Sequence, residues 1–226
     1  MRKLSAKWVP KCLKADQKRQ RCQSSEKNLE FFRCNPNDFL SRLVTVDETW
    51  LYHYDPETEK LLMEWRHSGS IHPKKFRFQK CAGKFLASIF WDQDGILFID
   101  YLHKGQIINA EYYSSLLVQL KGIFKEKRRG NLTKGGVLFL HENAPGHRAL
   151  ATQKKLSYLS FRYLDHPPYY PDVAPSDYDL LPGLKKQLKG RHFSSDAEVN
   201  AAADTSLDGQ PSEFYFEWLA IVRATG

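Results

Sequence analysis

Two stretches of the chain decide its fold: VLFLHENAPGH at residues 137–147 and HPPYYPDVAPSDY at residues 166–178. The apolar run at 137–140 ends abruptly in His141-Glu142-Asn143, which predicts a buried strand with a carboxylate at its C-terminal edge. Thirty-four residues separate Glu142 from Asp177, and a second apolar run, at 43–46, leads directly into Asp47. Three acids that an α/β fold brings together would form a site for divalent metal, and such sites most often serve phosphodiester chemistry.

Length and composition favour a globular protein. A chain of 226 residues with 42% apolar residues can build one full-sized domain and an appendage. The cysteines stand at positions 12, 22, 34 and 81 without a CxxC pair, so we expect reduced thiols rather than disulfides or zinc. No apolar stretch is long enough to span a membrane, and the start lacks an apolar signal core. We therefore expect a soluble chain that is not secreted.

The charge is concentrated at the N-terminal end. The net charge is +8, and residues 1–35 alone hold ten Lys and Arg against three acids. We predict a basic helical linker segment over residues 1–35, with a helix from about Ala15 to Phe32, and a main domain over residues 36–226. The basic run is either a solvated helix face or an arm that lies along nucleic acid.

The main domain reads as strands followed by alternating helices and strands. Leu43–Asp47 and its extension through Trp50–Tyr54 form the first strand, and residues 85–91 and 96–99 form a hairpin. Asp92 and Asp94 are turn formers in that hairpin. Helices are predicted from the cap Asn109, at about 149–157, after Ser176 and after the capping box at 195–198, with strands at 137–140 and 161–164.

Two stretches carry the basic residues that we predict for DNA binding. The first interleaves cations with Trp65, Phe76 and Phe78, a mixture that could hold phosphates and stack on bases, although a solvated loop would have the same composition. The second lies on the helix that follows Ser176. The predicted DNA-binding residues are Arg66, Lys74, Lys75, Arg77, Lys80, Lys84, Lys185, Lys186, Lys189 and Arg191.

This order of elements is that of a ribonuclease-H-like (retroviral-integrase-like) α/β domain, with a mixed sheet flanked by helices. Four motifs carry a family resemblance: WVPKCL at 8–13, VTVDETW at 44–50, LHENAPGH at 140–147 and HPPYYPDVAPSDY at 166–178. They are similar to the WVPHEL, LHDNAxxH and HPPYSPDLAPSDY motifs of mariner transposases and to the first acidic motif of that family. The chain thus resembles a mariner transposase of the Tc1/mariner superfamily over nearly its whole length.

The resemblance implies a site and an activity. Asp47, Glu142 and Asp177 match the three catalytic, metal-binding carboxylates of the family, which hold two Mg²⁺ or Mn²⁺ ions. Mariner transposases cleave DNA strands and join the excised element to a TA target, without a nucleotide cofactor. The partners implied are double-stranded DNA and a second copy of the chain, with no membrane, and the location implied is the nucleus.

Three departures from the family predict attenuated activity. Glu142 stands where the family has Asp, and its extra methylene moves the carboxylate by about 1.5 Å. The chain begins at the linker motif, without the helix-turn-helix region with which the family recognises its DNA ends. The ending FYFEWLAIVRATG differs from the family's helical C-terminus, which implies that this end is truncated.

Other functions fit the sequence less well. The runner-up is an inactive or domesticated transposase remnant that only binds DNA without sequence specificity. A plain ribonuclease-H-like nuclease would not explain PPYYPDVAPSDY, and a Ser/His/Asp hydrolase lacks a GxSxG motif. His141 and His147 are candidates for contact with the scissile region, and for His141, beside the strand-end carboxylate, a supporting or packing role is the alternative.

Overall fold

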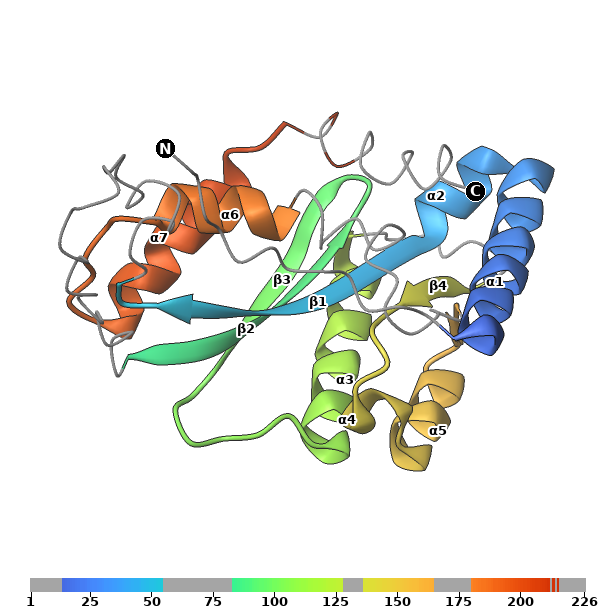
Figure 1. Ribbon diagram of the computed structural model, residues 1–226, viewed down its shortest axis with the longest axis horizontal. Helices are drawn as coiled ribbons and strands as arrows, with labels where there is room; N and C mark the ends of the chain where they lie inside the picture. Colours follow the sequence, from blue (N-terminus) through green and yellow to red (C-terminus); the bar gives the residue numbers. More distant parts are fainter. Residues whose placement is uncertain are drawn as a thin grey trace, which may run out of the picture.

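The computed structural model describes residues 14–54, 83–127, 136–164 and 180–211, together with Glu213 and Tyr215. Figure 1 shows a twisted sheet with helices on both sides and α1 beside the end of the sheet that carries β4. The elements, in chain order, are α1 (Ala15–Cys34), α2 (Pro36–Arg42), β1 (Leu43–Tyr52), β2 (Lys84–Asp92), β3 (Gly95–Leu102), α3 (Ala110–Lys127), β4 (Val137–Leu140), α4 (Pro145–Arg148), α5 (Leu150–Tyr158), β5 (Phe161–Tyr163), α6 (Leu181–Leu188) and α7 (Asp196–Asp208).

The described strands form one mixed sheet in the order β3-β2-β1-β4-β5. β1, β2 and β3 pair antiparallel, whereas β4 pairs parallel with β1 and β5 pairs parallel with β4. The long strand β1 is therefore the centre of the sheet. It joins the antiparallel meander to the parallel part, as Figure 1 shows.

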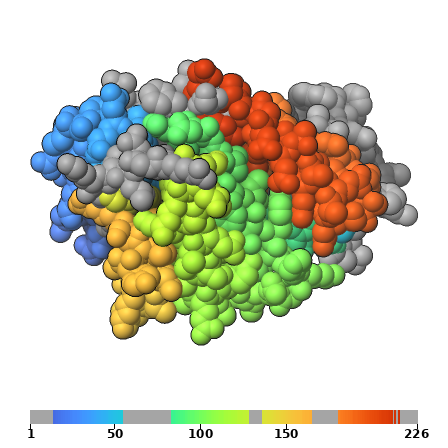
Figure 2. Space-filling model, turned by 180° about the vertical axis from the view of Figure 1, so that it is seen from behind, coloured from blue at the N-terminus to red at the C-terminus, as the bar shows by residue number. Residues whose placement is uncertain are grey.

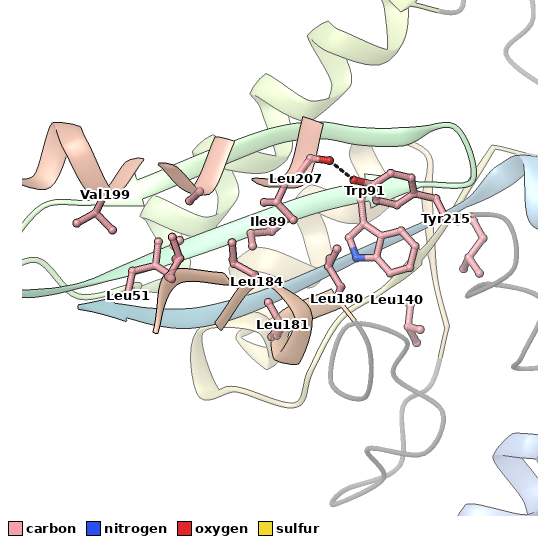
Figure 3. Packing of buried hydrophobic residues seen from close by; sticks show 14 of the residues in the cluster. Leu51, Ile89, Trp91, Leu140, Leu180, Leu181, Leu184, Val199, Leu207 and Tyr215 are labelled. Atoms are coloured by element: carbon pink, nitrogen blue, oxygen red, sulfur yellow. Dashed lines mark hydrogen bonds between the residues drawn. The ribbon is translucent and has the colours of Figure 1, made fainter. Parts of the chain in front are cut away.

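The two faces of the sheet bury separate hydrophobic clusters, because alternate residues of a strand point to opposite faces. One cluster contains Leu43 and Leu51 of β1 and packs against α2, α6 and α7. Figure 3 shows the leucines of α6 and α7 lying over Ile89 and Trp91 on this face. The other cluster contains Val44 and Val46 and packs against α3 and α5, the helices that lie side by side in the view from behind (Figure 2).

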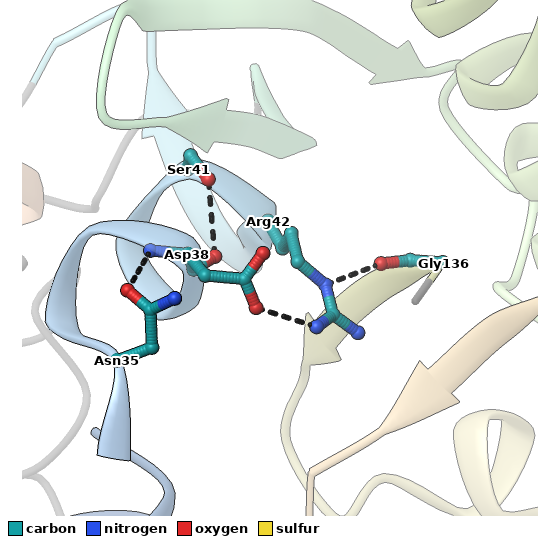
Figure 4. Close-up of polar contacts among 5 residues, drawn as sticks. All are labelled: Asn35, Asp38, Ser41, Arg42 and Gly136. Atoms are coloured by element: carbon teal, nitrogen blue, oxygen red, sulfur yellow. Dashed lines mark hydrogen bonds and ion pairs between the residues drawn. The ribbon is translucent and has the colours of Figure 1, made fainter. Parts of the chain in front are cut away.

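A buried arginine stabilises the junction between β1 and β4. Arg42, at the end of α2, is 6% exposed. Its Nε donates to the carbonyl oxygen of Gly136 at 2.8 Å, and its Nη1 lies 2.8 Å from Asp38 Oδ2 (Figure 4). Gly136 has φ +72°, and a Cβ there would lie 2.6 Å from the Ser160 carbonyl oxygen. Position 136, just before β4, therefore requires glycine.

Most of the elements predicted from the sequence are confirmed. The basic helix, the long first strand, the hairpin, α3, β4, α5, β5 and α7 all lie where their patterns indicate. The turn role of Asp92 is also confirmed, because its Oδ1 accepts the N–H of Asp94 at 2.9 Å. Two short helices were missed, α2 and α4, and both begin at a proline in the first turn.

Some sequence predictions stay open. The start of the helix predicted after Ser176 lies outside the described residues. The later part of that helix is described and is α6. The division into segments 1–35 and 36–226 stays a prediction, although Phe31 and Phe32 of α1 pack edge-on against Phe39 of α2. Cys22 and Cys34, the cysteines in the described part, are free thiols. None of the helices in the described ranges has the length and apolar character needed to cross a membrane.

Replacing Arg42 by Met should lower the free energy of unfolding by about 1–3 kcal/mol, because the Gly136 carbonyl and the Asp38 carboxylate lose their shared donor. Urea unfolding followed by circular dichroism would measure the change. Arg33→Ala, at an exposed position of α1, is the matched control and should stay within about 0.5 kcal/mol of the parent. Equal effects of the two substitutions would contradict the role of Arg42 in stabilising the junction between β1 and β4.

Candidate metal centre

The parallel pairing of β1 with β4 brings two of the predicted acids together. Thr45 pairs with Leu140, and two residues beyond this pair stand Asp47 on β1 and Glu142 on the loop after β4. Both carboxylates therefore arise at the same edge of the parallel part of the sheet. Asp47, Glu48 and Glu142 each offer a carboxylate oxygen, and these three oxygens lie within 4.8 Å of one another. The structure thus brings Asp47 and Glu142 together.

Asp47 is held by its own strand. It is 4% exposed and pairs with Ile89 of β2. Its Oδ1 accepts the backbone N–H of Glu48 at 2.8 Å. A carboxylate in such a position is oriented by the main chain before any cation binds.

Glu48 is a third acid of the cluster that the sequence analysis missed. Its side chain is 13% exposed, and its Oε1 lies 3.0 Å from His147 Nε2. As the neighbour of Asp47 along β1, it starts on the other face of the sheet, the face covered by α3. Its carboxylate nevertheless reaches the cluster. The only sequence signal was its place beside Asp47 in VTVDETW.

His147 lies behind the acids and contacts two of them. It is 1% exposed, its Nδ1 lies 3.1 Å from the main-chain carbonyl oxygen of Glu142, and its Nε2 faces Glu48. The imidazole stacks on the Tyr113 ring of α3 at 3.9 Å between centroids. His147 thus joins the middle of β1 to the loop after β4. The sequence predicted contact with the scissile region for His147; these contacts show a supporting position beside the acids, which the sequence did not predict.

The short helix α4 places His147 in this position. Its Gly146 carbonyl accepts the Thr152 hydroxyl of α5 at 2.7 Å. Gly146 also passes so close to the start of α3 that an added Cβ would lie 3.1 Å from the Ile108 carbonyl oxygen. Contacts on two sides therefore fix the turn that carries the imidazole.

His141 has a packing role in the structure. It is 3% exposed, and its ring lies among Phe139, Tyr163 and Tyr113. Its Nδ1 forms a 2.8 Å hydrogen bond with the Tyr113 hydroxyl. Burial, and then the nearby charge of Glu48, raises the pKa of Tyr113 well above its usual value, so this phenol stays neutral.

The remaining predicted site residues fall into two groups. Asp177 and the basic residues Arg66, Lys74, Lys75, Arg77 and Lys80 lie outside the described residues. Lys84, Lys185, Lys186 and Arg191 are exposed and Lys189 is half-buried. Lys84 pairs with Tyr52 and places its Nζ 4.4 Å from the centre of the Trp50 ring. Tyr52 is five residues beyond Asp47, or about 17 Å along β1.

The donor set of the cluster fits a hard divalent cation. Its three groups are all carboxylates, and Mg²⁺ and Mn²⁺ prefer oxygen ligands of this kind. Thiol and imidazole nitrogen ligands, which favour zinc, are not part of the cluster, since both nitrogens of His147 face oxygens.

The sheet order, the helices on both faces and the acids in the middle of β1 and after β4 define a ribonuclease-H-like domain. Residues 55–134 match the family model "Transposase (partial DDE domain)". The Mariner Mos1 transposase of Drosophila mauritiana is 31% identical over 211 residues, which cover 93% of this chain and 60% of that protein. The histone-lysine N-methyltransferase SETMAR of Homo sapiens is 28% identical over 209 residues, 92% of this chain and 30% of that protein.

Solved structures of Mos1 agree with these matches. The Mos1 catalytic domain has a TM-score of 0.76 and 28% identity, over 96% of this chain and 93% of that chain. Paired-end complexes of Mos1 with Mn and with Mg have TM-scores of 0.84 and 0.83 at 28% identity, over 99% of this chain and 64% of theirs. A paired-end complex with the left transposon end has a TM-score of 0.81 at 28% identity, over 99% and 66%.

This chain is a homologue of the mariner transposase catalytic domain. It spans about 60% of the length of Mos1 and 30% of that of SETMAR.

Two glycine substitutions should have opposite effects on stability. In Gly146→Ala the new methyl group would press on backbone atoms before α3, so we expect a loss of about 1–3 kcal/mol. In Gly122→Ala, on an open face of α3, nothing lies within 4 Å and alanine favours the helix, so we expect a gain of about 0.5–1 kcal/mol. Thermal unfolding would measure both. A neutral Gly146→Ala would show that α4 is not tightly held.

Proposed function

We propose that this chain performs metal-dependent DNA strand cleavage and strand transfer, as a mariner-type transposase catalytic domain with attenuated activity. The observation that carries the proposal is the matched position of Asp47 and Glu142 beyond the last β1–β4 pair, with ligand oxygens within 4.8 Å. The likeness to Mos1 paired-end complexes that contain Mn or Mg supports it.

In this proposal Asp47, Glu142 and Asp177 hold two Mg²⁺ or Mn²⁺ ions. When bound, such ions supply Lewis-acid activation of the attacking hydroxyl group and neutralise charge on the leaving oxygen. The carboxylates bind and orient the ions, and Asp47 is held for this role by the N–H of Glu48. In cleavage, a water oxygen bonds to phosphorus, the bond from phosphorus to the 3′-oxygen breaks, and the 3′-oxygen takes up a proton. In transfer, the freed 3′-hydroxyl attacks a phosphodiester of the target in the same way.

We attribute the attenuation to Glu142. The added methylene displaces the carboxylate by about 1.5 Å unless the side chain adopts a compensating rotamer. Mg²⁺ demands nearly ideal octahedral geometry, so a displaced carboxylate weakens its binding. Mn²⁺ also prefers oxygen ligands, and the site is therefore tested with both ions.

The proposed partner is double-stranded DNA, and the proposed place of action is the nucleus. The exposed cations of α6 and Lys84 could contact phosphates, together with the predicted basic residues outside the described part of the chain. The exposed Trp50 beside Lys84 offers an aromatic surface at the same end of β1. A homodimer is proposed on the resemblance of the chain to the mariner family.

Plasmid nicking in Mg²⁺ and in Mn²⁺ tests the proposed activity. We expect weak nicking by the parent chain and faster nicking by Glu142→Asp. Asp47→Ala should lower the nicking rate by more than about 100-fold, because removal of a metal ligand costs more than removal of a residue that only orients a ligand. Glu111→Gln, which changes an exposed acid at the start of α3, is the control and should act like the parent. Nicking that survives Asp47→Ala would show that this cluster is not the active site.

One observation favours a second function, a remnant that only binds DNA. Among the three predicted acids, Glu142 is the one that differs from the Asp of the mariner motif. The exposed lysines of α6 do not depend on Glu142. If Glu142→Asp does not nick DNA with either metal, DNA binding alone replaces strand cleavage and transfer as the proposed function.

The remnant function requires salt-sensitive DNA binding without metal. The affinity should fall linearly on a log–log plot against salt, and the double substitution Lys185→Ala/Lys186→Ala should reduce the slope by up to about 2 if both side chains contact phosphates. Fluorescence anisotropy with a duplex in EDTA would measure this. Lys154→Ala, at an exposed position of α5, is the control for a general loss of charge. Absence of binding at low salt would exclude the remnant function.

A further inference from the structure

We infer that His147 is a positioning residue for the metal centre: it holds the Glu48 carboxylate and the main chain at Glu142 in the arrangement that binds the cation. The inference rests on the proposed metal site. It adds two residues, His147 and Glu48, that the family's acidic set does not include.

The first step of the argument is the pair of contacts on one ring. The main-chain carbonyl of Glu142 can only accept a hydrogen bond, so Nδ1 of His147 is the donor in the 3.1 Å contact. The opposite nitrogen, Nε2, lies 3.0 Å from a carboxylate oxygen of Glu48, and this contact is an attractive ion pair when the ring carries a proton on both nitrogens. A single rigid ring therefore sets the distance between a residue of β1 and a residue after β4. The pairing between β1 and β4 ends two residues before Asp47 and Glu142, at Thr45 and Leu140.

The second step is that the ring itself cannot move. It is 1% exposed, stacks on Tyr113 and lies nearly parallel to His141 at 5.0 Å between centroids. The turn that carries it is fixed by Thr152 and by the close approach of Gly146 to α3. A contact made by an immobile ring restrains its partners more than a contact from a flexible surface side chain, because little side-chain entropy remains to be lost.

The third step concerns Glu48. This carboxylate is 13% exposed and has an oxygen within 4.8 Å of those of Asp47 and Glu142. Three carboxylates so close together repel one another, and the partner at His147 holds one of them in place. Acids and histidines that orient metal ligands commonly contribute 10–100-fold to metal affinity.

Substitutions at His147 separate positioning from packing. His147→Phe keeps a ring against Tyr113 but has neither nitrogen. His147→Asn retains a donor near Nδ1, toward Glu142, and His147→Gln retains one near Nε2, toward Glu48. The Mn²⁺ affinity of the full chain, measured by electron paramagnetic resonance of free Mn²⁺, and the melting temperature in EDTA are the two readouts. Tyr101→Phe, which removes the hydrogen bond from Tyr101 on β3 to Asp204 on α7, controls for destabilisation alone.

We expect His147→Phe to weaken Mn²⁺ binding about 10–100-fold, Asn and Gln to weaken it less, and Tyr101→Phe to bind like the parent. Parent-like affinity in His147→Phe would overturn the inference and leave the proposed metal site intact. If the Phe variant does not fold, the other two decide: parent-like affinity in both overturns the inference, and a loss in either supports it. Failure of the parent chain to bind Mn²⁺ would instead remove the proposed metal site, and the inference with it.

Discussion

The parallel pairing of β1 with β4 is the constraint on which the site depends. Parallel strands keep equivalent residues level with one another, so the pair Thr45–Leu140 places Asp47 and Glu142 side by side although they are far apart in sequence. The junction is fixed at its start by Arg42, which reaches the Gly136 carbonyl from the end of α2. A shift of β4 by one residue would turn Glu142 to the other face and separate the acids.

The acids also depend on what covers each face of the sheet. Asp47 shares its face with Leu43 and Leu51, which pack against α6 and α7, while Glu48 points to the face of α3. Consecutive acids on one strand thus reach the cluster from opposite sides. Such an arrangement is possible only at the point where β4 has ended, because a continuing neighbour strand would separate the two carboxylates.

Sequence patterns predicted most elements because they depend on local signals: apolar runs for the strands, helical spacing for α3, and Asn109 as its cap. They also predicted Asp47 and Glu142, because an apolar run precedes each of them. Glu48 and the supporting role of His147 depend on tertiary contacts. Strand alternation assigns Glu48 to the face away from Asp47, and a histidine five residues after Glu142 has no pattern that turns its ring back toward the strand. The short helix α4 that turns it was missed for the same reason.

The support behind Glu142 bears on the proposed attenuation, in which Glu142 stands where the mariner motif that the sequence resembles has Asp. If the main chain were free, a small movement of the loop could absorb the extra methylene and return the carboxylate to its place. His147 opposes that movement, since its Nδ1 holds the Glu142 carbonyl and its ring is stacked and buried. The side-chain torsions of Glu142 must then absorb the added length. In the proposed function, attenuation therefore arises from a rigid main-chain support combined with a longer ligand side chain.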